Sequence, residues 1–179
     1  MTGPLEGLRV LDFSRVLAGP FATMHLADLG ATVVKVERPG SGDDTRAFGP
    51  PFSNGVSTYF LSVNRGKQSI AIDLKTEEGR KMALELAAVA DVVIENFRPG
   101  VMERLGLGPD VLRAQNPRLI YCGISGFGRD VNRAGYDLVI QGMGGIPSIT
   151  GEPDGDPAKC GASIADLVTG LYAVQGILA

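Results

Sequence analysis

The chain has 179 residues, of which 44% are hydrophobic, and this length is sufficient for one substantial α/β core. Its 17 basic and 20 acidic residues are spread along the sequence and give a net charge of −3, which argues against a nucleic-acid partner. The sequence has no apolar run of about eighteen residues and no secretory signal pattern, so we expect a cytoplasmic protein without membrane spans. One histidine and two cysteines without C-x-x-C spacing argue against a metal site and a disulfide framework.

Five apolar segments rich in β-branched residues, each bounded by turn residues, are predicted to be strands. They cover residues 8–13, 32–37, 69–74, 91–95 and 118–123. Helices are predicted at 19–29, where Pro20 suits the first turn, at 76–90 and at 163–179. Strands that alternate with helix-length segments pair in parallel through right-handed crossovers. The sequence therefore predicts a doubly wound, mostly parallel α/β fold that binds ligands at the carboxyl ends of its strands.

The segment 38–64 lies between the second and third predicted strands and is interrupted by glycines and prolines. These are Gly40, Gly42, Gly49, Pro50, Pro51 and Gly55. The segment is too long for a passive connection. It is predicted to be a functional loop without regular structure.

The final predicted helix carries Asp166 in its first turn, roughly opposite an apolar stripe and beside small residues that would let a ligand approach. The stripe consists of Ile164, Leu167, Val168, Leu171, Val174 and Leu178, and the small residues are Thr169, Gly170 and Ala173. The helix dipole favours the ionised carboxylate, which suits a nucleophile. Ser163 and Asp166 also have capping-box spacing, and spacing alone favours this cap without excluding a nucleophile.

Six separated segments carry motifs that are individually weak and jointly specific. They are residues 11–21, 26–40, 64–69, 72–75, 93–100 with Arg104, and 135–137 with 165–170. Together these segments resemble the class III CoA-transferases, the CaiB/BaiF family that includes formyl-CoA transferase, carnitine CoA-transferase and α-methylacyl-CoA racemase. The resemblance spans nearly the whole chain and implies an enzyme with a Rossmann-like large domain.

The resemblance implies a reaction for Asp166. In such enzymes the matching aspartate attacks an acyl-CoA thioester, forms a mixed anhydride and then an aspartyl-CoA thioester, and finally passes CoA to an acceptor carboxylate. Coenzyme A and acyl-CoA are then substrates, and no tightly bound cofactor or metal is implied. Succinyl-CoA is a candidate donor, because residues 145–151 together with 155–157 are most similar to members that act on dicarboxylic acids.

The resemblance also implies residues that bind the ligands. CoA would contact Ala18, Arg38, Ile72, Lys75, Asn96, Phe97 and Arg104. The basic residues among them would hold phosphates, and Phe97 would pack on adenine or on the pantetheine arm. Tyr59 and Tyr136 are implied in substrate binding, with the Tyr59 hydroxyl as a hydrogen-bond donor to a carboxylate.

Two departures from the family pattern bear on the reaction. Racemases of the family use a histidine where Tyr136 stands, and His25 is the single histidine here, so CoA transfer is preferred to racemisation. Leu17 stands where formyl-CoA transferase has a glutamine, which argues against formyl and oxalyl substrates. A nicotinamide-dependent oxidoreductase is disfavoured, because residues 14–20 lack a glycine fingerprint.

The largest departure is length. Full members of the family continue through a smaller second domain and return to complete the first, and two such chains interlock. The resemblance therefore implies that residues 1–179 are the N-terminal part of the CoA-binding catalytic large domain, which would be incomplete without the C-terminal part. The partner would be a second copy in an interlocked homodimer or the complementary chain of a split enzyme. A non-catalytic CoA-binding role is the alternative from another class.

Overall fold

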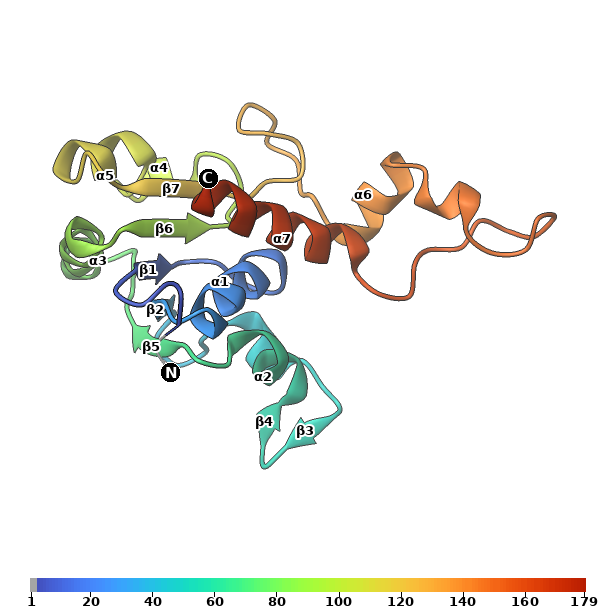
Figure 1. Ribbon diagram of the computed structural model, residues 1–179, viewed down its shortest axis with the longest axis horizontal. Helices are drawn as coiled ribbons and strands as arrows, with labels where there is room; N and C mark the ends of the chain where they lie inside the picture. Colours follow the sequence, from blue (N-terminus) through green and yellow to red (C-terminus); the bar gives the residue numbers. More distant parts are fainter. Residues whose placement is uncertain (1–2) are drawn as a thin grey trace.

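A five-stranded parallel sheet forms the centre of the molecule, as seen in a computed structural model that describes residues 3–179 (Figure 1). Its strands are β1 (Arg9–Asp12), β2 (Thr32–Glu37), β5 (Gln68–Ala71), β6 (Val92–Glu95) and β7 (Ile120–Gly123). They lie in the order β5-β2-β1-β6-β7, and every neighbouring pair runs parallel. All five predicted strands are confirmed, and their order is that of a Rossmann-like sheet.

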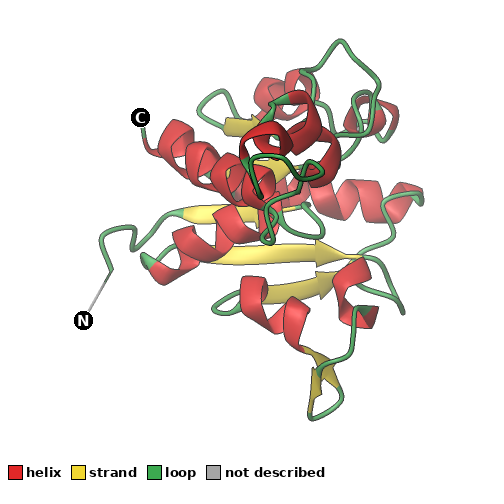
Figure 2. Cartoon of the chain, turned by 90° about the vertical axis from the view of Figure 1, so that its right-hand side faces the viewer, coloured by secondary structure: helices red, strands yellow, loops and turns green. Residues whose placement is uncertain are grey.

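Helices cover both faces of the sheet, which confirms the doubly wound prediction (Figure 1 and Figure 2). One face carries α1 (Ala18–Asp28) and α7 (Ile164–Leu178), and the other carries α3 (Glu77–Val89), α4 (Val101–Arg104) and α5 (Pro109–Gln115). On the first face, Leu26 and Ile177 share a buried cluster with Val33. On the second face, Ala83 and Met102 belong to a separate buried cluster. The predicted helices at 19–29, 76–90 and 163–179 correspond to α1, α3 and α7.

The strand order reverses in the middle of the sheet, between β1 and β6. Leu11 of β1 pairs with Val34 of β2 on one side and with Val93 of β6 on the other. The connections that leave the carboxyl ends of β1 and β6 therefore diverge, and such a switch point leaves a crevice at that edge. Residues 13–17 and 96–100 follow these two strands and border the crevice.

The segment 38–64 is ordered into short elements, so the prediction of an irregular loop is wrong. It contains the 3-10 helix η1 (Asp44–Ala47), a hairpin of β3 (Phe52–Ser53) and β4 (Val56–Ser57), and α2 (Thr58–Asn64). Side-chain caps begin both helical pieces: Asp43 accepts a hydrogen bond from the Thr45 N–H, and Ser57 accepts one from the Phe60 N–H. Local polar contacts stabilise this segment despite its many glycines and prolines.

The prediction for the two sides of α7 is wrong in part. Gly170 is buried and Asp166, one turn earlier on the same side, is half-buried, whereas three residues of the predicted apolar stripe are exposed. The exposed residues are Val168, Leu171 and Leu178. The cause is the close approach of α1, because a Cβ at Gly170 would lie 2.8 Å from the carbonyl oxygen of Ala18. Gly170 therefore serves helix packing, and Asp166 lies on the same side of α7.

The region between β7 and α7 extends away from the sheet (Figure 1). It contains α6 (Asp137–Met143) and the 3-10 helix η2 (Ile146–Ile149). The start of α6 lies beside the start of α7 and is hydrogen-bonded to it. Among the helices of residues 3–179, none combines the length and the apolar composition that crossing a bilayer requires.

Candidate active site

A cavity of about 320 Å³ lies at the switch point, next to the carboxyl ends of β1 and β6. Its walls come from the segments after β1, β6 and β7 and from the first turns of α6 and α7. Five of the predicted site residues line it: Ala18, Asn96, Phe97, Tyr136 and Asp166. The fold therefore brings together residues that are far apart in the sequence, at the edge of the sheet where Rossmann-like proteins bind ligands.

The backbone of Asp166 is held by a second carboxylate from another helix. Ser163 forms no side-chain cap on α7, so the capping box predicted for Ser163 and Asp166 is wrong. Instead, Asp137 Oδ1 accepts hydrogen bonds from the backbone N–H groups of Ala165 (2.9 Å) and Asp166 (3.3 Å). Within residues 3–179, no hydrogen bond reaches the carboxylate of Asp166 itself. That carboxylate is therefore available to a ligand in the cavity.

The environment raises the pKa of Asp166 to about 6. Burial is the larger cause, and the charge of Asp137 adds to it. The helix dipole was expected to favour ionisation, and the direction predicted from it is wrong because burial outweighs it. At pH 7 the carboxylate still exceeds the protonated acid by about tenfold, since one pH unit is a factor of ten. Asp166 is thus a more basic anion than an ordinary aspartate and remains mainly ionised.

The segment 14–17, of which Val16 and Leu17 line the cavity, is fixed by polar contacts from distant parts of the chain. Asn96 Oδ1 accepts the N–H of Arg15 (2.8 Å), and Asn96 Nδ2 donates to the carbonyl of Arg15 (2.7 Å). The N–H of Val16 donates to Asp43 (3.3 Å). Val16 has a φ of 67°, which a β-branched residue rarely adopts, so these contacts hold a strained backbone in place. Asn96 therefore shapes the wall beside Ala18 as well as lining the cavity.

The other predicted CoA contacts lie outside this cavity. Arg38 follows β2, Lys75 lies in the connection after β5, and Arg104 ends α4; all three side chains are exposed. Arg38 forms an ion pair with Asp44. Ile72 is 3% exposed and belongs to the core, so it can meet a ligand only through its backbone. The role of these four residues in binding CoA stays a prediction.

The two predicted substrate-binding tyrosines lie in different surroundings. Tyr59 is on α2, edge-on to Phe48 with 5.7 Å between the ring centroids, and does not line the cavity. The pKa of its hydroxyl is raised, first by burial and then by the charge of Asp166. Tyr136 lines the cavity and is 68% exposed. Their contacts with substrate stay a prediction.

A buried charged cluster beneath the segment 14–17 was missed in the sequence analysis. Lys67 Nζ lies 3.1 Å from Asp12 Oδ2, and Lys35 Nζ lies 2.9 Å from Asp43 Oδ2 and donates to the carbonyl of Ser14 (2.7 Å). Burial alone would raise the pKa of Asp12, but the lysines and two hydroxyl groups lower it to about 2. The signal in the sequence that could have revealed this cluster is Lys35, a lysine inside the otherwise apolar strand 32–37. Within residues 3–179, no group of three or more His, Cys, Asp or Glu residues is placed to hold a metal ion.

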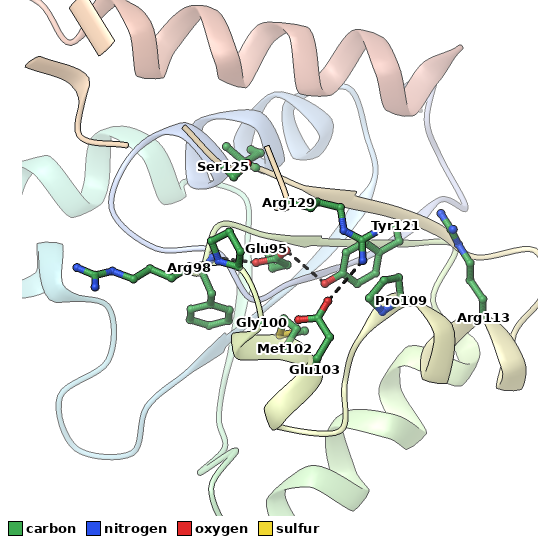
Figure 3. Close-up of a pocket in the computed structure, with 14 residues that line it drawn as sticks. Glu95, Arg98, Gly100, Met102, Glu103, Pro109, Arg113, Tyr121, Ser125 and Arg129 are labelled. Atoms are coloured by element: carbon green, nitrogen blue, oxygen red, sulfur yellow. Dashed lines mark hydrogen bonds and ion pairs between the residues drawn. The ribbon is translucent and has the colours of Figure 1, made fainter. Parts of the chain in front are cut away.

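A second cavity of about 250 Å³ adjoins the first and shares residues 97–99 and 124–125 with it (Figure 3). Tyr121 points toward Glu95 there, with its hydroxyl 3.3 Å from Oε1, and Arg129 meets Glu103 at 3.4 Å. Burial raises the pKa of Glu95. A long ligand that extends from Asp166 past Phe97 would enter this second space.

The architecture and the site together define a Rossmann-like enzyme domain whose candidate nucleophile is an aspartate at the start of a helix. The sequence profile of CoA-transferase family III matches residues 5–179, and the chain belongs to this family. The resemblance noted in the sequence is confirmed by this match.

Three relatives show how far the similarity extends. The chain is 54% identical to succinyl-CoA:glutarate CoA-transferase of Mus musculus, over 98% of this chain and 41% of that protein. It is 52% identical to succinate–glutarate CoA-transferase of Agrobacterium fabrum, over 98% of this chain and 46% of that protein. The crystal structure of a CaiB/BaiF family protein from Brucella suis matches with a TM-score of 0.95 and 52% identity, over 99% of this chain and 49% of that one. The chain therefore spans about half the length of the relatives it matches.

Proposed function

We propose that this chain is the nucleophile-bearing part of an enzyme that transfers CoA from an acyl-CoA donor to a free carboxylic acid. The observation that carries this proposal is the carboxylate of Asp166, which lines the switch-point cavity and accepts no hydrogen bond within residues 3–179. The other carboxylate on the cavity wall, Asp137, is occupied by three N–H donors. Asp166 is therefore the better nucleophile of the two, and the names of the relatives agree with this chemistry.

The proposed reaction proceeds through three covalent intermediates on Asp166: a mixed anhydride with the donor acid, an aspartyl-CoA thioester and a mixed anhydride with the acceptor acid. A carboxylate oxygen attacks the thioester carbonyl, the C–S bond breaks, and CoA leaves as a thiolate. The thiolate then attacks Cγ of Asp166, which gives an aspartyl-CoA thioester and releases the donor acid as a carboxylate. The acceptor carboxylate attacks this thioester, and the expelled thiolate takes the acceptor acyl group and frees Asp166. Each step consumes one anion and releases another. Coenzyme A is a substrate in this scheme, which includes no tightly bound cofactor.

Succinyl-CoA is the proposed donor, and a dicarboxylic acid is the proposed acceptor. Similar proteins are named as transferases from succinyl-CoA to glutarate and to mesaconate, both dicarboxylic acids. Arg133 lines the cavity with Asp166, stacks on Phe127 at 4.7 Å, and forms no ion pair within residues 3–179. A guanidinium group in this setting suits the second carboxylate of such an acceptor.

Arg133→Gln is expected to raise the KM for glutarate about tenfold to a hundredfold, because a hydrogen bond to a charged group contributes about 1.5–3 kcal/mol. The KM for butyrate, which lacks the second carboxylate, should change much less. Steady-state kinetics with both acceptors measures the difference. Arg118→Gln, at an exposed position that lines neither cavity, is the matched control. Equal increases for glutarate and butyrate would contradict the role given to Arg133.

Racemisation of an acyl-CoA is the alternative within the family. Tyr136 lies on the cavity wall where the racemases have a histidine. His25, the single histidine, lies in α1 with its ring 4.5 Å from that of Phe21 and does not line the cavity. This placement supports CoA transfer over a mechanism that needs a histidine at the α-carbon.

The transfer is tested by trapping the intermediate. The protein is incubated with succinyl-CoA and quenched with hydroxylamine or borohydride, and its peptides are analysed by mass spectrometry. A modification in the peptide that contains Asp166 supports the transferase. Binding of CoA without any adduct favours the non-catalytic CoA-binding role, and deuterium uptake at the α-carbon of a 2-methylacyl-CoA favours racemisation.

We also propose that residues 1–179 form the N-terminal part of the large domain and that another protein surface completes it. Apolar side chains on α7 and near η2 are exposed: Leu171 by 45%, Tyr172 by 69% and Ile149 by 86%. An interlocked second copy or the complementary chain of a split enzyme fits this surface. A cytoplasmic location is part of the same proposal, because Cys122 and Cys160 are free thiols, as is usual in a reducing compartment.

A further inference from the structure

The side chain of Asp137 joins α6 to α7. Asp137 is the first residue of α6, and its Oδ1 accepts the backbone N–H groups of Ala165 (2.9 Å) and Asp166 (3.3 Å). These groups belong to the first turn of α7, where a helix has no internal acceptors for its N–H donors. Because Ser163 supplies no cap, Asp137 caps α7 from a different helix.

A buried glutamine fixes the second oxygen of Asp137. Gln141, one turn later in α6, is 0% exposed, and its Nε2 donates to Asp137 Oδ2 at 2.6 Å. The Oε1 of Gln141 accepts the N–H of Cys160 at 2.8 Å, so the glutamine is itself held in place. Asp137 therefore has one orientation, and that orientation determines where Asp166 lies.

All hydrogen-bond donors to Asp137 are electrically neutral. Within residues 3–179 it has no ion pair, so its charge acts on Asp166 across a partly desolvated space. Other titratable groups on the cavity wall or on elements near Asp166 are Tyr59, Arg98, Arg133, Tyr136, His25, Asp28, Tyr121 and Cys122. Among all these groups, the charge of Asp137 is the one that adds to burial in raising the pKa of Asp166.

We propose that Asp137 is a positioning residue for the transfer reaction: it aims Asp166 into the cavity and, through its charge, makes the Asp166 anion more reactive. The inference rests on the proposed function, in which Asp166 is the nucleophile. Acylation converts the anionic side chain of Asp166 into a neutral anhydride and so removes the repulsion between the two carboxylates. Repulsion that is present in the ground state and absent after attack favours the attack.

The test removes the charge of residue 137 and keeps its hydrogen bonds to the start of α7. Asp137→Asn retains an oxygen that can accept the two N–H groups of α7. The carboxyl carbon of Asp166 is followed by 13C NMR as a function of pH, without substrate, and Asp166→Asn assigns its signal. The titration midpoint is expected to fall from about 6 toward the ordinary value of 3.8. In kinetics, the acid limb of kcat should move to lower pH and kcat above pH 7 should fall, while the KM for acyl-CoA changes less than about twofold.

A second variant keeps the inference testable if Asp137→Asn does not fold. The new amide donates where Asp137 accepted from Gln141, so Asp137→Asn/Gln141→Glu restores an acceptor and places the charge one side chain further from Asp166. Its midpoint should also lie below that of the unmodified protein. A midpoint that stays near 6 in a folded variant overturns the inference, even if stability falls. A lowered midpoint without an acyl adduct on the unmodified protein overturns the proposed function instead.

Discussion

Asp166→Asn is expected to abolish the acyl adduct and to lower kcat for CoA transfer by at least about a thousandfold, the scale seen when a catalytic nucleophile is removed. An amide does not attack a thioester at neutral pH, so no covalent intermediate can form. Asparagine has nearly the same shape, and no hydrogen bond within residues 3–179 reaches the Asp166 carboxylate, so the fold should be retained. Peptide mass spectrometry after incubation with succinyl-CoA, together with steady-state kinetics, measures both effects.

Two further variants sharpen this experiment. Asp166→Ala cannot revert by deamidation and should give the same loss. Asp154→Asn removes a carboxylate from an exposed loop and should leave the rate unchanged. CoA affinity in the Asp166 variants should remain close to that of the unmodified protein. Transfer that persists in Asp166→Ala, or an adduct found on Asp137, would show that a different group is the nucleophile.

The strands and the main helices could be predicted because their apolar patterns are regular. The five strands are short β-branched runs, Pro20 and Gly30 mark the two ends of α1, and Thr76 caps the start of α3. The order within 38–64 could not be predicted, because it depends on caps formed by Asp43 and Ser57 rather than on a periodic pattern. The buried side of α7 was missed because Gly170 packs closely against α1, and a hydrophobicity pattern does not register contact through a glycine.

The candidate site was predicted in part. Asp166, Asn96 and Phe97 were singled out by their motifs, and the fold places them in one cavity. The contact between Asp137 and α7 depends on the relative position of two helices, which sequence spacing does not reveal. The predicted cap at Ser163 had the correct spacing, but Asp137 from another helix takes its place. Tertiary contacts therefore decide the protonation of Asp166, and local sequence alone indicates the opposite direction.

Lys35→Met is expected to lower the free energy of unfolding by about 3–5 kcal/mol, the usual cost of removing one partner of a buried ion pair. Lys35 Nζ lies 2.9 Å from Asp43 Oδ2, and the two side chains are 1% and 0% exposed. Without the lysine, the Asp43 carboxylate is buried without its cation, and the carbonyl of Ser14 loses its donor. Urea unfolding followed by circular dichroism measures the change. Since Val16 and Leu17, which follow Ser14 closely, line the cavity, transfer activity should fall as well.

Two controls and the pH dependence identify the cause of this loss. Lys35→Met/Asp43→Asn removes both charges and should recover much of the stability. Arg65→Ala breaks an exposed pair with Asp28 and should cost less than about 1 kcal/mol.

Burial would raise the pKa of Asp43, and Lys35 is the main group that holds it below its usual value. Lys35→Met should therefore raise the pKa of Asp43 in the folded protein above its value in the unfolded chain. The variant then binds a proton more readily when folded, and its deficit should shrink as the pH falls from 7 toward 4. A deficit that is independent of pH would mean that lost packing, rather than the unpaired charge of Asp43, destabilises the variant.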